Sequence, residues 1–163
     1  MPTKPNISAS DRISQAFGKL TDSAAVLNDA SDEFSKAIAP VDNALKKLNL
    51  GVKAWHRYFN SGPDQDGDYW ERHIGYAKVG GKWGLALSST NGNLNYEDTP
   101  EQWLFNDAPR WMRVEAIDHI PALLEELVKQ ANNMTADLKT KTEKARELAL
   151  TIAAESEKHD GRR

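Results

Sequence analysis

Three aspartates at alternate positions, Asp64, Asp66 and Asp68, form the most suggestive polar cluster in the chain. Calcium-binding loops begin in this way, because their carboxylate oxygens must converge at about 2.3–2.6 Å from the cation. The rest of the loop does not fit, since Tyr69 stands where a glycine is required and Gly75 stands where a bidentate glutamate is required. The spacing therefore predicts a solvated turn rather than a metal site, and we expect no cofactor.

A second candidate for chemistry is a pair of histidines on neighbouring predicted strands, His56 and His73, with Glu71 close to them in the sequence. Imidazole and carboxylate groups held together can transfer protons or bind a metal. No HExxH spacing and no nucleophile elbow accompanies them. We therefore do not expect an enzyme. A ligand-binding or catalytic site at the junction of the sheet and the helices stays open as an alternative function.

Basic and aromatic side chains interleave in the middle of the chain, as they do in proteins that bind single-stranded nucleic acids. Residues 50–113 nevertheless carry seven basic and eight acidic side chains, whereas binding to a polyanion normally needs a concentrated positive charge. Nucleic acid is therefore disfavoured as a partner and is the weakest functional hypothesis. The interleaved residues are Lys53, Arg57, Arg72, Lys78 and Lys82 with Trp55, Tyr58, Trp70 and Trp83.

The overall composition of the 163 residues excludes several classes of protein. Without cysteine there can be no disulfide, thiol nucleophile or thiolate metal site. No window approaches the roughly 18 consecutive apolar residues of a membrane span, and the first residues lack the apolar core of a secretory signal. With a net charge of −3 and a mean hydropathy of −0.66, we expect a soluble cytoplasmic protein without a membrane partner.

Aromatic residues and glycines divide the chain into three parts. Eleven of the 13 aromatic residues and eight of the ten glycines lie between Gly51 and Arg113, while the flanks are rich in Ala, Lys, Glu, Asp, Leu and Ser. This distribution predicts two long, solvated helices on either side of a compact insert. The predicted segments are a tail at 1–7, a helix at 8–50, the insert at 51–112, a helix at 113–158 and a tail at 159–163.

Each predicted helix carries apolar residues at alternating spacings of four and three over about 40 residues. Such a heptad seam is typical of helices that pack along one partner, and the similar lengths predict an antiparallel coiled-coil hairpin within one chain. Pro40 and Pro121 lie inside the runs and predict bends. The seams could instead pair between chains, or two hairpins could form a four-helix dimer. The assigned seam residues include Phe17, Leu20, Leu27, Phe34, Ile38, Leu124, Leu127, Leu138 and Leu148.

The insert is predicted to contain a small antiparallel sheet. Residues 52–60 have the pattern of a strand, although they also continue the helical spacing of the first helix. Strands at 69–79 and 82–89 are joined by Gly80 and Gly81, a pair that favours a two-residue hairpin turn.

The predicted hairpin register gives the sheet two unlike faces. It places Ile74 opposite Leu87 and Tyr76 opposite Leu85, which makes one face bulky and apolar. The other face consists of small residues, and either the second helix or the loop in the 90s covers it or a partner docks there. The predicted partner-binding residues are Trp55, Tyr58, Trp70, Tyr76, Gly75, Ala77, Gly84 and Ala86.

Together these features predict an α+β fold in which two long antiparallel helices bracket a small antiparallel sheet. In architecture alone, this plan resembles that of prefoldin-type chaperone subunits. The predicted function is non-enzymatic: an interaction or scaffold protein whose partners are another protein or further copies of itself.

Overall fold

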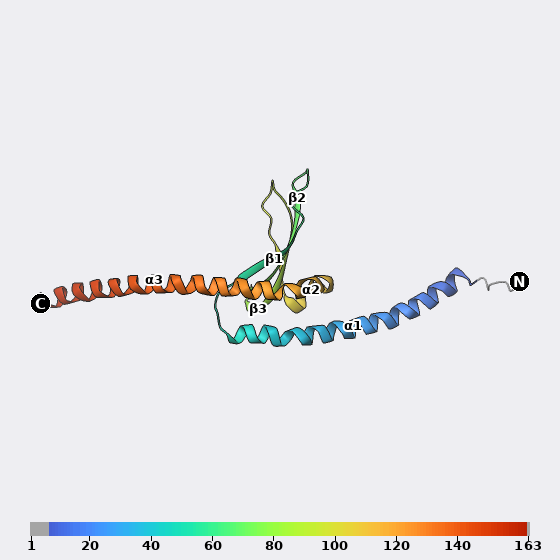
Figure 1. Cartoon of the computed structure of the whole chain (residues 1–163), viewed down its shortest axis with the longest axis horizontal. Helices are drawn as coiled ribbons and strands as arrows, with labels where there is room; N and C mark the ends of the chain where they lie inside the picture. Colours follow the sequence, from blue (N-terminus) through green and yellow to red (C-terminus); the bar gives the residue numbers. More distant parts are fainter. Residues whose placement is uncertain (1–6, 163) are drawn as a thin grey trace. The chain divides into compact units, whose positions relative to one another are not determined.

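The computed structural model describes residues 7–162, so positions 1–6 of the predicted N-terminal tail and Arg163 of the C-terminal tail lie outside the described residues. The chain divides into two compact units, with the boundary after Ala44. The first unit consists of most of one helix, and the second contains the sheet and the remaining helices (Figure 1). In chain order the elements are α1 (Ala9–Lys47), β1 (Ala54–Asn60), β2 (Asp68–Val79), β3 (Lys82–Asn93), β4 (Glu101–Leu104), the 3-10 turn η1 (Phe105–Asp107), α2 (Arg110–Ala116), the 3-10 turn η2 (Ile117–His119) and α3 (Ile120–Asp160).

The helix of the first unit, α1, begins directly after Ser8. The Ser8 hydroxyl accepts a hydrogen bond from the Asp11 backbone N–H (3.1 Å) and donates one to the Asp11 carboxylate (2.7 Å). The negative charge of this carboxylate is also favourable at the positive end of the helix dipole. The helix continues through Pro40, so this proline does not break it. Every residue of α1 up to Ala30 is exposed, including the apolar residues of the predicted seam.

The sheet has four antiparallel strands in the order β1-β2-β3-β4. β2 and β3 pair with Ile74 opposite Leu87, which confirms the predicted register. Gly80 and Gly81 have φ values of 56° and 82°, the positive values that a type I′ turn requires and that glycine adopts without steric cost. The strand predicted at 52–60 is present as β1.

β4 is a strand that the sequence does not predict. Its segment looks locally like the start of a helix, because Thr99 and Pro100 precede two polar residues and an aromatic run. In the structure Leu104 pairs with Ala86 and Gln102 with Ser88. Pairing with an already formed strand therefore outweighs the local preference of these residues.

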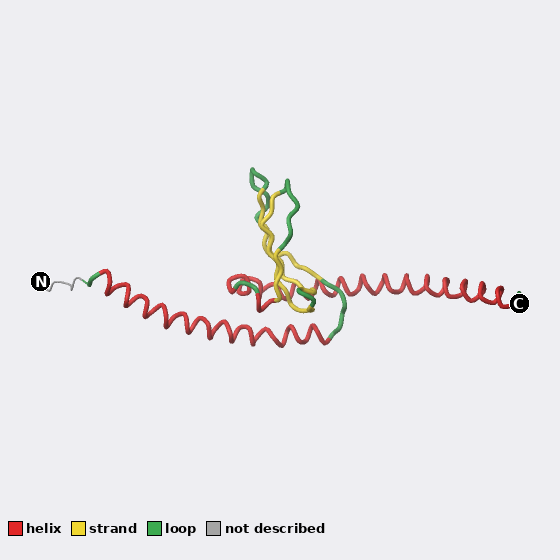
Figure 2. The backbone as a smooth tube through the Cα atoms, turned by 180° about the vertical axis from the view of Figure 1, so that it is seen from behind, coloured by secondary structure: helices red, strands yellow, loops and turns green. Residues whose placement is uncertain are grey.

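The bulky face of the sheet forms the core together with α2 and α3. α3 contacts β1 and β2, and α2 contacts β3. Figures 1 and 2 show α3 crossing the sheet and then continuing far beyond it. Complete burial of one large apolar side chain stabilises the fold by about 1.5–3 kcal/mol. The largest fully buried side chains are Ile74, Leu85 and Leu87 of the sheet, Met112 of α2 and Leu123 of α3.

The predicted coiled-coil hairpin is wrong. In α3 only the segment beside the sheet is buried, through Leu123 and Leu127, and every residue from 132 to 160 is exposed. The seam residues Leu138 and Leu148 are 60% and 54% exposed. An antiparallel partner helix would cover these side chains. The first part of the apolar face of α3 packs on the sheet. No other element of the described residues packs on the rest of that face.

The predicted seam of α1 leads to the same correction. Phe17, Leu20 and Leu27 are at least half exposed, whereas Phe34 is partly buried and Ile38 is buried. The two helices therefore do not bracket the sheet as a hairpin. The architectural resemblance to prefoldin-type chaperone subunits depended on that hairpin and is not supported. A heptad pattern predicts that one face of a helix is buried, but it does not identify the surface against which this face packs.

The second predicted helix is also divided differently from the prediction. α2 ends at Ala116, the 3-10 turn η2 follows, and α3 begins at Ile120. Pro121 thus lies in the first turn of α3, where its missing N–H removes no helical hydrogen bond. It starts a helix rather than bending one.

Candidate functional site

The second face of the sheet carries a tryptophan that lies directly on a glycine. Trp55 of β1 is opposite Gly75 of β2. A Cβ atom on Gly75 would overlap the Cε3 and Cδ2 atoms of the Trp55 ring and the carbonyl oxygen of Ala54. The absence of a side chain at Gly75 therefore allows the indole to lie against the strand and fixes its position.

Beside this indole is an open cavity of about 290 Å³. Residues two apart on a strand share a face, so Glu71 and His73 of β2 both line it, and their register partners on β3, Thr90 and Ser88, line it too. β4 contributes Gln102. The complete lining is Trp55, Glu71, His73, Ser88, Thr90, Pro100 and Gln102.

The charges around this cavity are balanced. Arg57 Nη1 donates a hydrogen bond to Glu71 Oε1 at 3.0 Å. His73 is half-buried, and its desolvation lowers the pKa of the imidazole, an effect that the nearby Glu71 carboxylate opposes. This desolvation favours the neutral imidazole, in which one nitrogen donates and the other accepts a hydrogen bond.

The predicted grouping of His56, His73 and Glu71 is not formed. His56 is opposite Ile74 in the ladder, whereas His73 is opposite Arg57, so the two histidines lie on opposite faces of the sheet. The His56 ring stacks on the His119 ring at 5.9 Å between centroids. Of the three residues, only Glu71 and His73 share a site.

Tyr58 lies on the helix-covered side of the sheet and is electrostatically unusual. Its ring stacks on that of His119 at 4.9 Å, and its hydroxyl is buried without a hydrogen-bond partner. Burial and, to a smaller extent, the negative charge of Glu115 raise the pKa of Tyr58 to about 12, although the positive charge of Arg72 opposes the shift. The phenol stays neutral, and its unpaired hydroxyl costs stability.

Arg72 is held by aromatic rings and a carboxylate on the same side. A β-bulge shifts the register of β1 between Arg57 and Phe59. The Arg72 guanidinium lies 4.3 Å from the Phe59 ring centroid and 4.7 Å from that of Trp111, and it pairs with Glu115 at 2.9 Å. This cation is engaged within the protein, although the nucleic-acid hypothesis needs it for phosphate contact.

The aspartate cluster is a hydrogen-bonded turn. The Asp64 Oδ1 atom accepts hydrogen bonds from the backbone N–H groups of Asp66 and Asp68, both at 2.9 Å, and Asp68 Oδ1 accepts one from the Asn93 side chain at 2.7 Å. Its carboxylates thus shape the loop itself. Within residues 7–162 no group of three or more histidines and acidic residues could hold a metal ion.

The remaining residues predicted to bind a partner differ in accessibility. Trp55 and Tyr58 are partly buried, whereas Trp70 is 43% exposed. Their partner-binding role stays a prediction, and Trp70 is the most accessible of them. The buried members of the set are Tyr76, Gly75, Ala77, Gly84 and Ala86.

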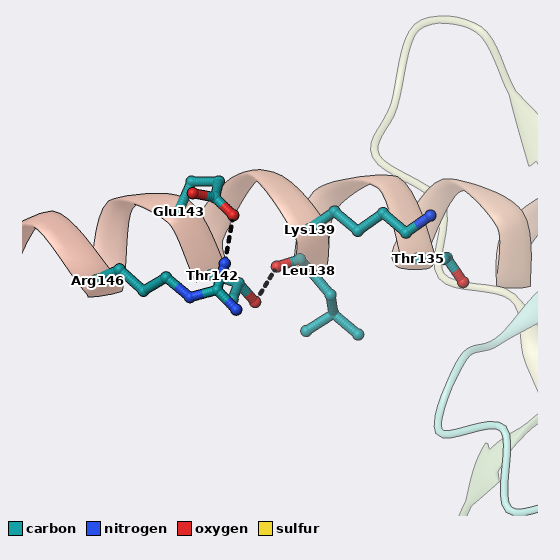
Figure 3. A pocket seen from close by; sticks show the side chains of 6 residues that line it. All are labelled: Thr135, Leu138, Lys139, Thr142, Glu143 and Arg146. Carbon is teal, nitrogen blue, oxygen red and sulfur yellow. Dashed lines mark hydrogen bonds and ion pairs between the residues drawn. The ribbon is translucent and has the colours of Figure 1, made fainter.

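A shallow depression far along α3 differs from the sheet cavity because a single helix forms it (Figure 3). Its polar groups already interact within the helix: the Thr142 hydroxyl donates to the Leu138 carbonyl at 2.7 Å, and Arg146 pairs with Glu143 at 2.6 Å. One helix face cannot enclose a small ligand. The open Leu138 side chain instead marks a face that a second helix could cover. The lining is Thr135, Leu138, Lys139, Thr142, Glu143 and Arg146.

Four of the seven residues that line the cavity, Ser88, Thr90, Pro100 and Gln102, are not among the predicted site residues. The predicted pairing of the strands at 69–79 and 82–89 implies that Ser88 shares a face with His73. Thr90 lies one residue beyond the predicted strand, and the structure places it opposite Glu71. Gln102 gives no such signal, because β4 is not predicted.

Comparisons with known proteins add no function. The sequence matches no protein-family model, and it has no significant similarity to a curated protein or to a solved structure. Among the helices of the described residues, none combines the length and apolar character needed to span a membrane.

Proposed function

We propose that this protein is a non-enzymatic scaffold that assembles with further copies of itself through α1 and α3 and thereby displays the four-stranded sheet module. One observation supports this proposal above all others: both long helices expose stripes of large apolar side chains. Exposed apolar stripes on soluble proteins mark interaction surfaces, and a helix gains most of its stability from packing such a face.

The exposed stripe of α3 lies next to the part that packs on the sheet. Leu124 and Val128 are 41% and 61% exposed, although Leu123 and Leu127 are buried. From Leu124 the stripe continues at alternating spacings of four and three without a charged residue. Its members are Leu124, Val128, Ala131, Thr135, Leu138, Thr142, Ala145, Ala149 and Ile152.

The stripe of α1 has small, uncharged neighbours on both sides. Large residues such as Phe17 and Leu20 form its centre, and no long charged side chain separates them from a partner. A helix can therefore approach closely along a wide face, as in a helix bundle. The residues that flank the stripe are Ser14, Thr21, Asn28 and Ser35 on one side and Ala16, Ser23, Ala30 and Ala37 on the other.

The size of the two stripes suits a dimer of this chain. At about 1.5 Å per residue, the stripes from Ile13 to Phe34 and from Ala131 to Ile152 are each roughly 30 Å long. With a helix width of about 10 Å, the pair offers on the order of 600 Å² per chain. A standard interface buries about 800 Å² per partner, so the two areas are of the same order.

A second copy is the occupant that these stripes favour. Each copy brings two stripes of similar length and the same uncharged character, so a symmetric assembly covers all of them without another component. The uncharged flanks of the α1 stripe also place no charge pattern on that part of the interface that would select a different partner.

Sedimentation equilibrium of the intact protein tests the proposal. The mass should exceed the 18.2 kDa of one chain and should return to that value in Leu138→Asp, which places a charge in the stripe. The matched control is Ala136→Asp, which adds the same charge on the opposite side of α3 and should still self-associate. A wild type that stays at the mass of one chain, with its helices folded, would overturn the proposal and point to a different partner.

A further inference from the structure

The cavity beside Trp55 has a rigid, flat wall. One side of the indole lies against Gly75, where even a methyl group would overlap it, and the ring also lines the cavity. The position of the ring is therefore fixed before any ligand arrives. A preformed aromatic surface offers an apolar contact to the flat face of a ligand ring at little entropic cost.

Groups that both donate and accept hydrogen bonds surround this wall. Ser88 and Thr90 provide hydroxyls, Gln102 provides a carboxamide, and His73 provides an imidazole. They come from three neighbouring strands, so they approach the cavity from several directions. A ligand that is complementary to these side chains carries several groups that both donate and accept hydrogen bonds, as hydroxyl groups do.

The charges exclude strongly ionic ligands. The only acidic residue of the lining is Glu71, and the lining contains no lysine or arginine, so phosphates and carboxylates have no countercharge in the cavity. A cationic ligand would compete with Arg57, which already pairs with Glu71 at 3.0 Å. The cavity therefore suits a neutral, polar ligand.

We propose that this cavity binds an uncharged carbohydrate, with the C–H face of one sugar ring on Trp55 and its hydroxyls on Gln102, Thr90 and Ser88. The volume of about 290 Å³ lies just below the usual range for small-ligand pockets, so the site takes a single sugar unit whose chain continues into solvent. The inference is independent of self-assembly, because all of the lining comes from the sheet unit of one chain.

Saturation-transfer difference NMR on the intact protein tests this site, with maltotriose, cellotriose and tri-N-acetylchitotriose as probes. At least one probe should show transfer to the ring protons of one terminal sugar. Gln102→Ala and Thr90→Val should each weaken its binding roughly threefold to tenfold, since each removes one hydrogen bond. Both residues lie at or near the surface, so these variants should keep the wild-type amide spectrum.

Trp70→Ala is the matched control, because Trp70 is an exposed tryptophan on the opposite face of the sheet. It should leave sugar binding unchanged, whereas Trp55→Phe should reduce it. Absence of transfer to all three probes would overturn the proposal. Transfer that depends on Trp70 but not on Gln102 and Thr90, or binding of adenosine or uridine without binding of any sugar, would overturn it equally.

Discussion

The two ends of α3 carry the same kind of apolar pattern but have different environments. Near its start Leu123 and Leu127 are buried on the sheet, whereas Leu138 and Leu148 farther along are more than half exposed. The sheet stabilises the first part by about 1.5–3 kcal/mol for each leucine that it covers, while the second part has no such contribution within one chain. An apolar heptad pattern therefore indicates that a helix face packs against another surface, but not which one. In α3 the part beside the sheet packs on the sheet.

The largest expected difference between the two ends comes from placing a charge in each. Leu127→Asp buries an unpaired carboxylate against the sheet and should cost about 3–5 kcal/mol. Leu138→Asp places the same charge on an exposed site of the stripe and should leave the unfolding of the sheet unit unchanged while weakening self-association. Urea unfolding followed by tryptophan fluorescence measures the first effect, since all five tryptophans lie between Gly51 and Arg113. Equal losses in both variants would contradict the distinction.

A smaller difference is expected between a glycine of the sheet and a glycine of the exposed helix. Gly75→Ala should destabilise the sheet unit by about 1–3 kcal/mol, because its Cβ overlaps Trp55 and a backbone oxygen. Gly18→Ala in α1 meets nothing within 4 Å and should stabilise the helix by roughly 0.5–1 kcal/mol. Urea midpoints and helical circular dichroism measure the two effects. A neutral Gly75→Ala would show that the indole does not lie on this glycine.

Tyr58→Phe should stabilise the sheet unit by up to about 1 kcal/mol, because it removes a buried hydroxyl without a partner. The pH dependence provides a second readout. The pKa of Tyr58 is raised to about 12 in the folded state, so its ionisation leaves the free energy of unfolding unchanged below the unfolded pKa near 10 and lowers it as the pH rises toward 12. The phenylalanine variant should lack this alkaline loss, and a lower urea midpoint for it at neutral pH would contradict the burial of the hydroxyl.

His73 should give the smallest effect. Burial lowers the folded-state pKa of His73. The contribution of its neutral imidazole to the free energy of unfolding is therefore complete above the unfolded pKa near 6.5 and is lost as the pH falls through the lower folded value. His73→Gln should flatten the stability profile between neutral and mildly acidic pH. His159→Gln, at an exposed position near the end of α3, is the control and should keep the wild-type slope. An unchanged slope in His73→Gln would argue against this desolvation.

The hairpin of β2 and β3 could be predicted because Gly80 and Gly81 fix its register locally. The same register also places Glu71 and His73 on one face. The position of His56 could not be predicted in this way, because a long loop joins β1 to β2 and leaves open which residues of β1 share a face with His73. β4 could not be predicted either, since pairing with β3 overrides its local preference. The partner of each helical stripe is decided by surfaces distant in the sequence.

The most direct test of the central claim is the helical circular dichroism signal of the wild-type protein, recorded with its sedimentation mass over a dilution series. Self-assembly through the exposed stripes predicts that the mass falls toward that of one chain on dilution and that helical signal is lost with it, since isolated helices are marginal in water. A mass that stays at one chain with a constant helical signal at every concentration would contradict the claim.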